Sequence, residues 1–185
     1  MLHHDGKGYV EEYLMESGVA YTILQPTHFM DNFPVREMMG EEAGEVVFPV
    51  MWDPEIGFCF VAVKDLGMVG KMVLEEREKH FLACYPIVGT ERMSYNEVCG
   101  VVGRVIGKEV RVEKRGFEES VDTFLSMMFG GRADSKIRDA TERMLLYYNR
   151  HGLVGNKNVL EWLIGRKATG YQEWAQGMKE DITTQ

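Results

Sequence analysis

The sequence predicts an α/β protein whose first half alternates strands with helices and whose second half is mostly helical. As far as about residue 116, short β-rich runs alternate with amphipathic segments of helical period. From residue 117 to about residue 181 the apolar residues follow helical spacing, interrupted only at glycine-rich positions. A chain of 185 residues suits one domain. We therefore expect a single domain over 1–185, with an α/β part at about 1–116 and a helical part at about 117–185.

Each expected element has a local signal in the sequence. The expected helices of the first half are His3–Ser17, which Gly18 ends, Asp65–Arg77, which Asp65 caps, and 94–106, which opens with a Ser94/Glu97 capping box. Thr27 is expected to cap a short helical turn that ends before Pro34. The expected strands are Ala20–Leu24, Glu45–Val50, Phe58–Val63, His80–Val88 and Val110–Glu113.

Composition excludes several classes of protein. The formal net charge is -8, and the densest basic stretch, Lys108–Arg115, is diluted by glutamates, which argues against a nucleic-acid partner. Three scattered cysteines without CxxC spacing predict neither a metal site nor a disulfide framework. No apolar run approaches the roughly 18 residues that a membrane span needs, and the first residues do not resemble a signal peptide. We expect a cytoplasmic protein without a membrane partner.

Twenty glycines make a phosphate-binding loop worth seeking. The nearest candidate places Gly100, Gly103 and Gly107 ahead of Lys108. Its spacing fails the Walker pattern, and its glycines fall inside or at the end of a predicted helix instead of between a strand and a helix. We expect these glycines to permit close helix packing and to end the helix.

Four segments, in order and in register, resemble the NmrA-like family, a group of atypical short-chain dehydrogenases/reductases. The residues that carry the resemblance are His3–Gly8 with Val10–Tyr13, Tyr21–Asn32, Val61–Gly67, and Tyr85–Gly89 with Met93-Ser94 and Gly107–Val110. The tail, with Gly152–Asn156 and Leu160–Arg166, looks like fungal members of the family.

The resemblance covers the C-terminal part of the family's fold. It implies a Rossmann-like sheet whose first half, with the glycine-rich loop that binds the dinucleotide, would precede residue 1. We therefore expect a truncated Rossmann-like fold with a small parallel or mixed sheet, which is either a natural truncation or a fragment. Without that loop, we expect no nucleotide cofactor.

Lys7 stands where short-chain dehydrogenases keep the lysine of their Tyr-x-x-x-Lys pair, and His3 stands at the tyrosine's position. In the related enzymes that lysine holds the nicotinamide ribose. Residues four apart share one face of a helix, so His3 and Lys7 are candidate catalytic groups for one site. The alternative is an exposed helix start in which Lys7 pairs with Glu11.

A second group of candidates follows the strand that ends at Leu24. His28 is a candidate acid or base, since the carboxyl end of a parallel strand is where α/β proteins bind ligands. In the family this loop lies against the nicotinamide and the substrate; a structural role is the alternative. The candidate substrate-binding residues are Gln25, Pro26, Thr27, Phe29 and Asn32, together with the apolar and adaptable Phe124, Met127 and Met128.

The sequence favours the first of three functions, because the motifs expected on the substrate side remain recognisable. The first is a cofactor-independent acid/base enzyme, of isomerase, cyclase or lyase type, that acts on a small molecule. The second is a regulatory NmrA-like protein that acts through protein partners, and the third is an NAD(P)-dependent reductase lacking its first half. Loss of the neighbouring strands would uncover Ala20–Leu24 and one face of the helix His3–Ser17, so we expect a homodimer.

Overall fold

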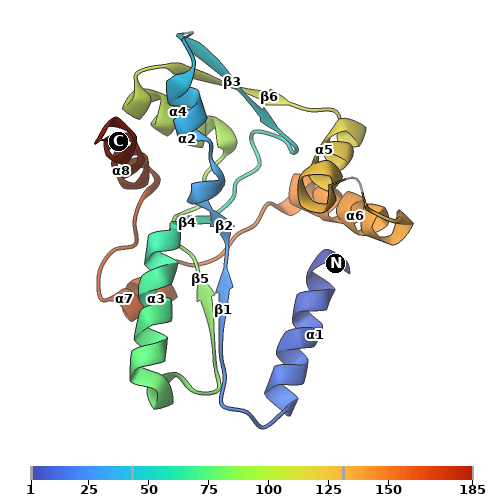
Figure 1. Ribbon diagram of the computed structural model, residues 1–185, viewed down its shortest axis with the longest axis vertical. Coiled ribbons are helices and arrows are strands. Elements are labelled where there is room, and N and C mark those ends of the chain that lie inside the picture. Colours follow the sequence, from blue (N-terminus) through green and yellow to red (C-terminus); the bar gives the residue numbers. More distant parts are fainter. Residues whose placement is uncertain (1, 43, 131, 185) are drawn as a thin grey trace.

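The computed structural model describes residues 2–42, 44–130 and 132–184, and within them it confirms an α/β fold (Figure 1). Within the described residues no helix has both the length and the apolarity that a bilayer span requires. The α-helices are α1 (Leu2–Glu16), α2 (Val35–Gly40), α3 (Val63–Glu76), α4 (Tyr95–Ile106), α5 (Phe117–Phe129), α6 (Ser135–His151), α7 (Asn158–Ile164) and α8 (Tyr171–Thr184). The strands are β1 (Thr22–Pro26), β2 (His28–Phe29), β3 (Glu45–Val50), β4 (Phe60–Val61), β5 (Ala83–Ile87) and β6 (Glu109–Lys114).

The described strands form three parallel pairs. β1 pairs with β5, from Thr22 opposite Ala83 to Pro26 opposite Ile87. The short β2 pairs with β4, and β3 pairs with β6 along six residues. Because parallel partners need a crossover, each pair joins segments that are far apart in the sequence.

The three pairs organise the molecule into two halves that meet at a waist. Figure 1 shows β1 and β5 below, between α1 and α3, with β3 and β6 above and the short β2 and β4 between them. α7 packs on β5 and α3, whereas α8 packs on α4 and α2. The largest hydrophobic cluster lies around the waist and the upper half, and it includes the buried Met30, Phe58, Phe60, Val98 and Trp174.

Several local predictions are confirmed. Ser94 accepts a hydrogen bond from the Glu97 N–H while the Glu97 carboxylate accepts one from the Ser94 N–H, which is the expected capping box of α4. Gly107 ends α4 with a φ of 76°, in the left-handed region that favours glycine. A Cβ at Gly103 would lie 2.7 Å from the Lys108 carbonyl oxygen, so this glycine permits the close approach of α4 to the chain entering β6.

Two of the predicted caps are wrong. α3 begins at Val63 after Ala62, and Asp65 is fully buried within the first turn of the helix. The Thr27 hydroxyl donates to the Ile87 carbonyl at 3.4 Å, and the 3₁₀ turn Met30–Asn32 follows Phe29 without a side-chain cap. In both cases a partner distant in the sequence engages the polar side chain.

An unpredicted helix and a shortened strand also differ from the expectation. α2 was not predicted; it begins directly after Pro34, since a proline at the start of a helix gives up an N–H that has no helical partner. The strand expected at Phe58–Val63 contracts to Phe60–Val61 because Phe58 forms an isolated antiparallel bridge with Met93 and Val63 already begins α3.

Asp65 joins α3 to the segment before α8. Its carboxylate accepts hydrogen bonds from Arg166 Nη2 at 2.6 Å, from the Thr169 N–H at 2.7 Å and from the Thr169 hydroxyl at 3.0 Å. Both Asp65 and Thr169 are fully buried, so this contact fixes the C-terminal segment against the α3 side of the sheet.

We predict that Asp65→Ala lowers the free energy of unfolding by about 3–5 kcal/mol, because it leaves buried donors without an acceptor. The matched control is Lys64→Ala, which removes an exposed ion pair with Glu173 and should cost less than about 1 kcal/mol. Denaturant unfolding followed by circular dichroism measures both variants. Equal effects of the two substitutions would contradict a structural role for the buried carboxylate.

Candidate functional site

The candidate site lies at the carboxyl ends of β1 and β2. β1 ends at Pro26, and His28 opens β2 two residues later, so His28 stands where the chain passes from the lower strand pair to the waist. The carboxyl ends of parallel strands are the usual ligand-binding edge of an α/β sheet.

His28 is surrounded by aromatic rings. Its ring stacks on Phe60 at 5.6 Å between centroids and 9° between planes, and it lies 5.5 Å from the ring of Trp52. The Nδ1 atom is 3.5 Å from the Tyr95 hydroxyl. Burial lowers the pKa of His28 to about 4, so the ring is neutral at pH 7. His28 is therefore suited to donate or accept a hydrogen bond in its neutral form.

The rings around His28 come from elements far apart in the sequence, and we call this group the aromatic cluster. Its members are His28, Trp52, Phe58, Phe60, Tyr95 and Tyr148. Burial raises the pKa of both tyrosines. The Trp52 Nε1 atom is buried and has no hydrogen-bond partner among the described residues, which leaves one donor free for an acceptor atom of a ligand.

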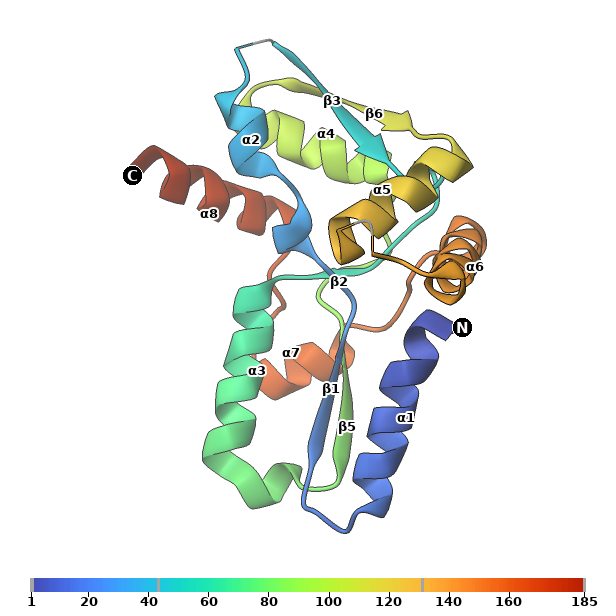
Figure 2. The same cartoon turned by 45° about the vertical axis from the view of Figure 1, so that its right-hand side comes forward.

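α1 approaches the cluster with its N-terminal end. Figure 2 shows α1 running beside β1 in the opposite direction, so that its first turn comes level with the carboxyl end of the strand. His4 Nε2 lies 2.8 Å from the Tyr148 hydroxyl, a hydrogen bond between residues 144 positions apart. Lower on the helix, Gln25 donates to Glu11 at 2.8 Å. These side-chain contacts hold α1 against the rest of the molecule.

These contacts define an inner stripe of α1. His4, Lys7, Glu11 and Leu14 follow one another at spacings of three and four residues and therefore share one side of the helix. His4, Glu11 and Leu14 are partly buried, whereas Lys7 is exposed on the same stripe. The Lys7 side chain thus projects from the side of α1 that carries the contacts to Tyr148 and Gln25. The alternative role for Lys7 was an ion pair with Glu11. In the structure Glu11 accepts a hydrogen bond from Gln25.

The other predicted residues are distributed unevenly. The backbone of His3 belongs to α1, but its side chain lies outside the described residues. Gln25, Pro26 and Asn32 are exposed near the strand end, while Thr27 and Phe29 are partly buried.

The predicted residues of α5 lie apart from His28. Phe124 packs in a separate hydrophobic cluster formed by α5 and α6, to which Trp52 also contributes. Met127 and Met128 are 72% and 59% exposed near the end of α5. The structure thus connects α5 to the aromatic cluster through Phe124 and Trp52 and leaves the two methionines on the surface.

Sequence reasoning missed the residues that complete the site, namely His4, Trp52, Tyr95 and Tyr148. His4 was passed over in favour of its neighbour His3, although the helical spacing of Lys7, Glu11 and Leu14 offered a signal for choosing between them. The other three lie in segments whose approach to His28 depends on tertiary packing, and no local pattern in the sequence reports it.

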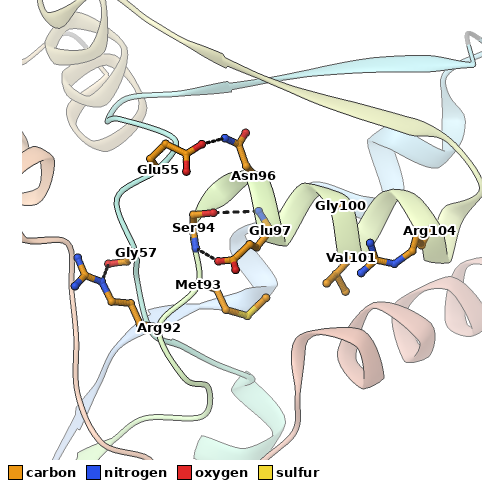
Figure 3. A pocket seen from close by; sticks show the side chains of 10 residues that line it. All are labelled: Glu55, Gly57, Arg92, Met93, Ser94, Asn96, Glu97, Gly100, Val101 and Arg104. Carbon is orange, nitrogen blue, oxygen red and sulfur yellow. Dashed lines mark hydrogen bonds between the residues drawn. The ribbon is translucent and has the colours of Figure 1, made fainter.

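A separate depression of about 770 Å³ opens at the start of α4 (Figure 3). Its polar groups are largely engaged with one another: Asn96 donates to Glu55, Arg92 Nε donates to the Gly57 carbonyl at 3.3 Å, and Ser94 and Glu97 form the capping box. Of the predicted site residues whose side chains the structure describes, none lines this depression.

Comparisons with known proteins place the chain in a family. The model of the NmrA-like family matches residues 1–180. The NAD(P)H azoreductase of Xenophilus azovorans is 25% identical over a match that covers 90% of this chain and 55% of the relative.

Solved structures show the same fold. An NADPH-dependent quinone oxidoreductase of Escherichia coli, complexed with NADPH, aligns with a TM-score of 0.69 at 17% identity. The alignment covers 91% of this chain and 57% of the oxidoreductase. NmrA, a negative transcriptional regulator in complex with NAD, aligns with a TM-score of 0.63 at 13% identity. The alignment covers 95% of this chain and 58% of NmrA. The chain thus spans a little over half the length of each of these proteins.

The comparisons correct one expectation. The sequence led us to expect no nucleotide cofactor. The relative from Xenophilus azovorans, however, is named an NAD(P)H azoreductase, and the two solved structures contain NADPH and NAD. The expectation of no cofactor is therefore wrong for this family of proteins. It rested on the missing glycine-rich loop, which is a property of the part of the fold that this chain does not span.

We predict that the stability of the protein falls as the pH is lowered from about 6.5 to about 4, by up to about 3 kcal/mol from His28 alone. The unfolded state binds a proton at the ordinary histidine pKa, whereas burial lowers the pKa of His28 to about 4 in the folded state. His28→Phe keeps a ring in the cluster and should remove this part of the pH dependence, while the exposed His151→Gln should not. Denaturant unfolding at several pH values measures the difference, and parallel profiles of wild type and His28→Phe would contradict the burial of His28.

Proposed function

Because the chain belongs to the NmrA-like family, we propose that it is the substrate-side half of an NAD(P)H-dependent reductase. The observation that carries the proposal is the meeting of the inner stripe of α1 with the carboxyl end of β1. Gln25, near the carboxyl end of β1, contacts Glu11, which lies one helical turn after Lys7, and His28 follows two residues after that strand. The first turn of α1 lies level with the same end of the strand (Figure 2).

The residues present fit one end of a dinucleotide. Lys7 occupies the position at which the family resemblance implies a lysine that holds the nicotinamide ribose, and its side chain is exposed on the stripe facing the strand end. The pyrophosphate would need a glycine-rich turn before a helix. Here the glycines of α4 are used for packing and for ending the helix, so this chain fits the nicotinamide end and not the phosphates.

The bound nucleotide would supply a hydride to an acceptor. The chain's own groups would then orient the acceptor and manage its proton. A flat molecule would contact the rings of Trp52 and His28, and the Trp52 N–H, which has no partner among the described residues, would donate to one of its oxygen or nitrogen atoms. The Tyr148 hydroxyl, bonded to His4, can hold the proton that the reduced acceptor takes up.

The proposed acceptor class follows from these residue types. Aromatic rings bind flat conjugated molecules by offset or edge contacts, and a single indole N–H fixes one heteroatom. Quinones and azo compounds have both features, and they are the groups named in the quinone oxidoreductase and the azoreductase to which this chain is similar. We propose an acceptor of this class.

The first prediction concerns the nicotinamide end. Lys7→Ala should weaken binding of NADPH by about tenfold or more, because a charge-assisted hydrogen bond to the ribose is worth about 1.5–3 kcal/mol. It should leave the melting temperature nearly unchanged, since the side chain is exposed. The control is Lys71→Ala, whose lysine pairs with Glu75 on the surface of α3. Calorimetric titration measures both, and unchanged affinity in Lys7→Ala would remove this lysine from the site.

The second prediction concerns the acceptor. A naphthoquinone should quench the fluorescence of Trp52, because we place its ring against the indole. Trp52→Phe should abolish most of the quenching, whereas Trp162→Phe, which changes a 70% exposed tryptophan on α7, should preserve it. Quenching that persists in Trp52→Phe and disappears in Trp162→Phe would place the acceptor elsewhere.

A further inference from the structure

The rings around His28 lie too close together to hold a flat molecule between them. The ring centroids of His28 and Trp52 are 5.5 Å apart, and those of Trp52 and Phe58 are 4.9 Å apart. A planar molecule held between two rings needs about 7 Å between them, because carbon atoms in contact rest about 3.5 Å apart. To lie between Trp52 and His28, a flat acceptor therefore needs one side of the aromatic cluster to move.

The groups packed against Trp52 differ in how firmly they are held. Phe58 and Phe60 are 0% and 2% exposed and belong to the largest hydrophobic cluster of the molecule. Trp52 also packs against the separate cluster of α5 and α6. This second cluster has buried residues of its own, namely Val121, Leu125, Met144 and Leu145. α5 and α6 can therefore move away from Trp52 without taking their common core apart.

The two helices are fastened to each other as one body, which we call the α5–α6 hairpin (residues 117–129 and 135–151). Arg138 of α6 donates to Glu118 and Asp122 of α5, both at 2.8 Å, and to Glu142 of its own helix at 3.0 Å. Figure 2 shows α5 and α6 beside the waist, apart from the lower strand pair. A pair of helices with its own core and its own ion pairs is suited to move as a rigid unit.

Glycines lie at both ends of the hairpin. Gly116 precedes α5, and Gly152 follows α6 with a φ of 65° and a ψ of -157°. The conformation of Gly152 is essentially restricted to glycine. A Cβ at this position would collide with the Gly57 carbonyl oxygen, so the chain is seated closely against the segment that follows Trp52. Residues at the ends of elements are where the backbone rotations of a hinge are absorbed.

Two consecutive residues of α6 fasten the hairpin in different directions. The Tyr148 hydroxyl lies 2.8 Å from His4 Nε2 and so holds the hairpin on α1. Asn149 Oδ1 accepts a hydrogen bond from the Asp53 N–H at 2.8 Å. Because Asp53 directly follows Trp52, the Asn149 bond ties the hairpin to the segment that carries the indole.

We propose that the contact between the α5–α6 hairpin and Trp52 is a gate, closed in this structure, and that Asn149 is its latch. The inference rests on the proposed function and adds how the acceptor enters the site. The acceptor separates the hairpin from the indole and takes its place there. The bond from Asp53 to Asn149 is then broken, while the bond from Tyr148 to His4 keeps the hairpin on α1. Because the latch is broken in the bound form, it opposes acceptor binding.

The test compares Asn149→Ala with Asn156→Ala, and it measures the Kd of a naphthoquinone through the quenching of Trp52. Asn156 Oδ1 accepts a hydrogen bond from the Asn158 N–H at 2.8 Å, which is the same kind of bond outside the hairpin. We expect Asn149→Ala to bind the quinone roughly two- to tenfold more tightly than wild type, since one hydrogen bond no longer opposes opening. Asn156→Ala should bind as wild type does. Asn149→Asp keeps an acceptor oxygen for the Asp53 N–H and should bind no more tightly than wild type.

A second readout does not require the acceptor. The Trp52 Nε1 atom is buried, so its hydrogen exchanges with deuterium from the solvent only when the indole is uncovered. We expect this exchange, followed by NMR, to be roughly two- to tenfold faster in Asn149→Ala than in wild type. It should be unchanged in Asn156→Ala.

Two results would overturn the gate. One is quinone binding that is unchanged or weaker in Asn149→Ala, because a residue that only positions Trp52 would support binding instead of opposing it. The other is exchange of the Trp52 indole hydrogen at the same rate in Asn149→Ala and wild type. A quinone that quenches Trp52 in none of the proteins would contradict the proposed acceptor, and the indole exchange would then decide on the gate by itself.

Discussion

Parallel pairing of β1 with β5 is the constraint on which the rest of the structure depends. Because both strands run in the same direction, the chain between them must return over the sheet, and it does so through β2, α2, β3, β4 and α3. The same pairing sets the carboxyl ends of the two strands side by side. α1 precedes β1 and runs opposite to it, so the start of this helix arrives at that end (Figure 2). The candidate site is a consequence of this geometry.

The sequence predicted the elements whose signals are local. The capping box at Ser94, the glycine that ends α4 and the strand Glu45–Val50 need only a few neighbouring residues to be recognised, and the structure confirms them. Asp65 and Thr27 carried cap-like signals as well, but each is bonded to a group distant in the sequence. The pairing of β3 with β6 joins residues more than 60 positions apart and has no local signature.

The same limit applies to the site. Lys7 and His28 were proposed because their types and positions resemble a known family, and both lie toward one end of the sheet. Tyr148 and Trp52 could not be found in this way, since α6 and the segment after β3 reach His28 only through the packing of the waist. The packing and helix-ending roles of Gly103 and Gly107 were predicted from their spacing, and the structure confirms them. The expectation of no cofactor was wrong, because a site can draw its parts from regions that one segment does not contain.

The central claim is that this chain provides the acceptor side of a nucleotide-dependent reduction. The most direct measurement follows the absorbance of NADPH in a mixture of a naphthoquinone and the chain fused to the portion of the quinone oxidoreductase that it does not match. We expect loss of NADPH only when both portions and the quinone are present, with a much lower rate in Lys7→Ala. A fusion that binds both NADPH and the quinone but does not oxidise the nucleotide would contradict the account.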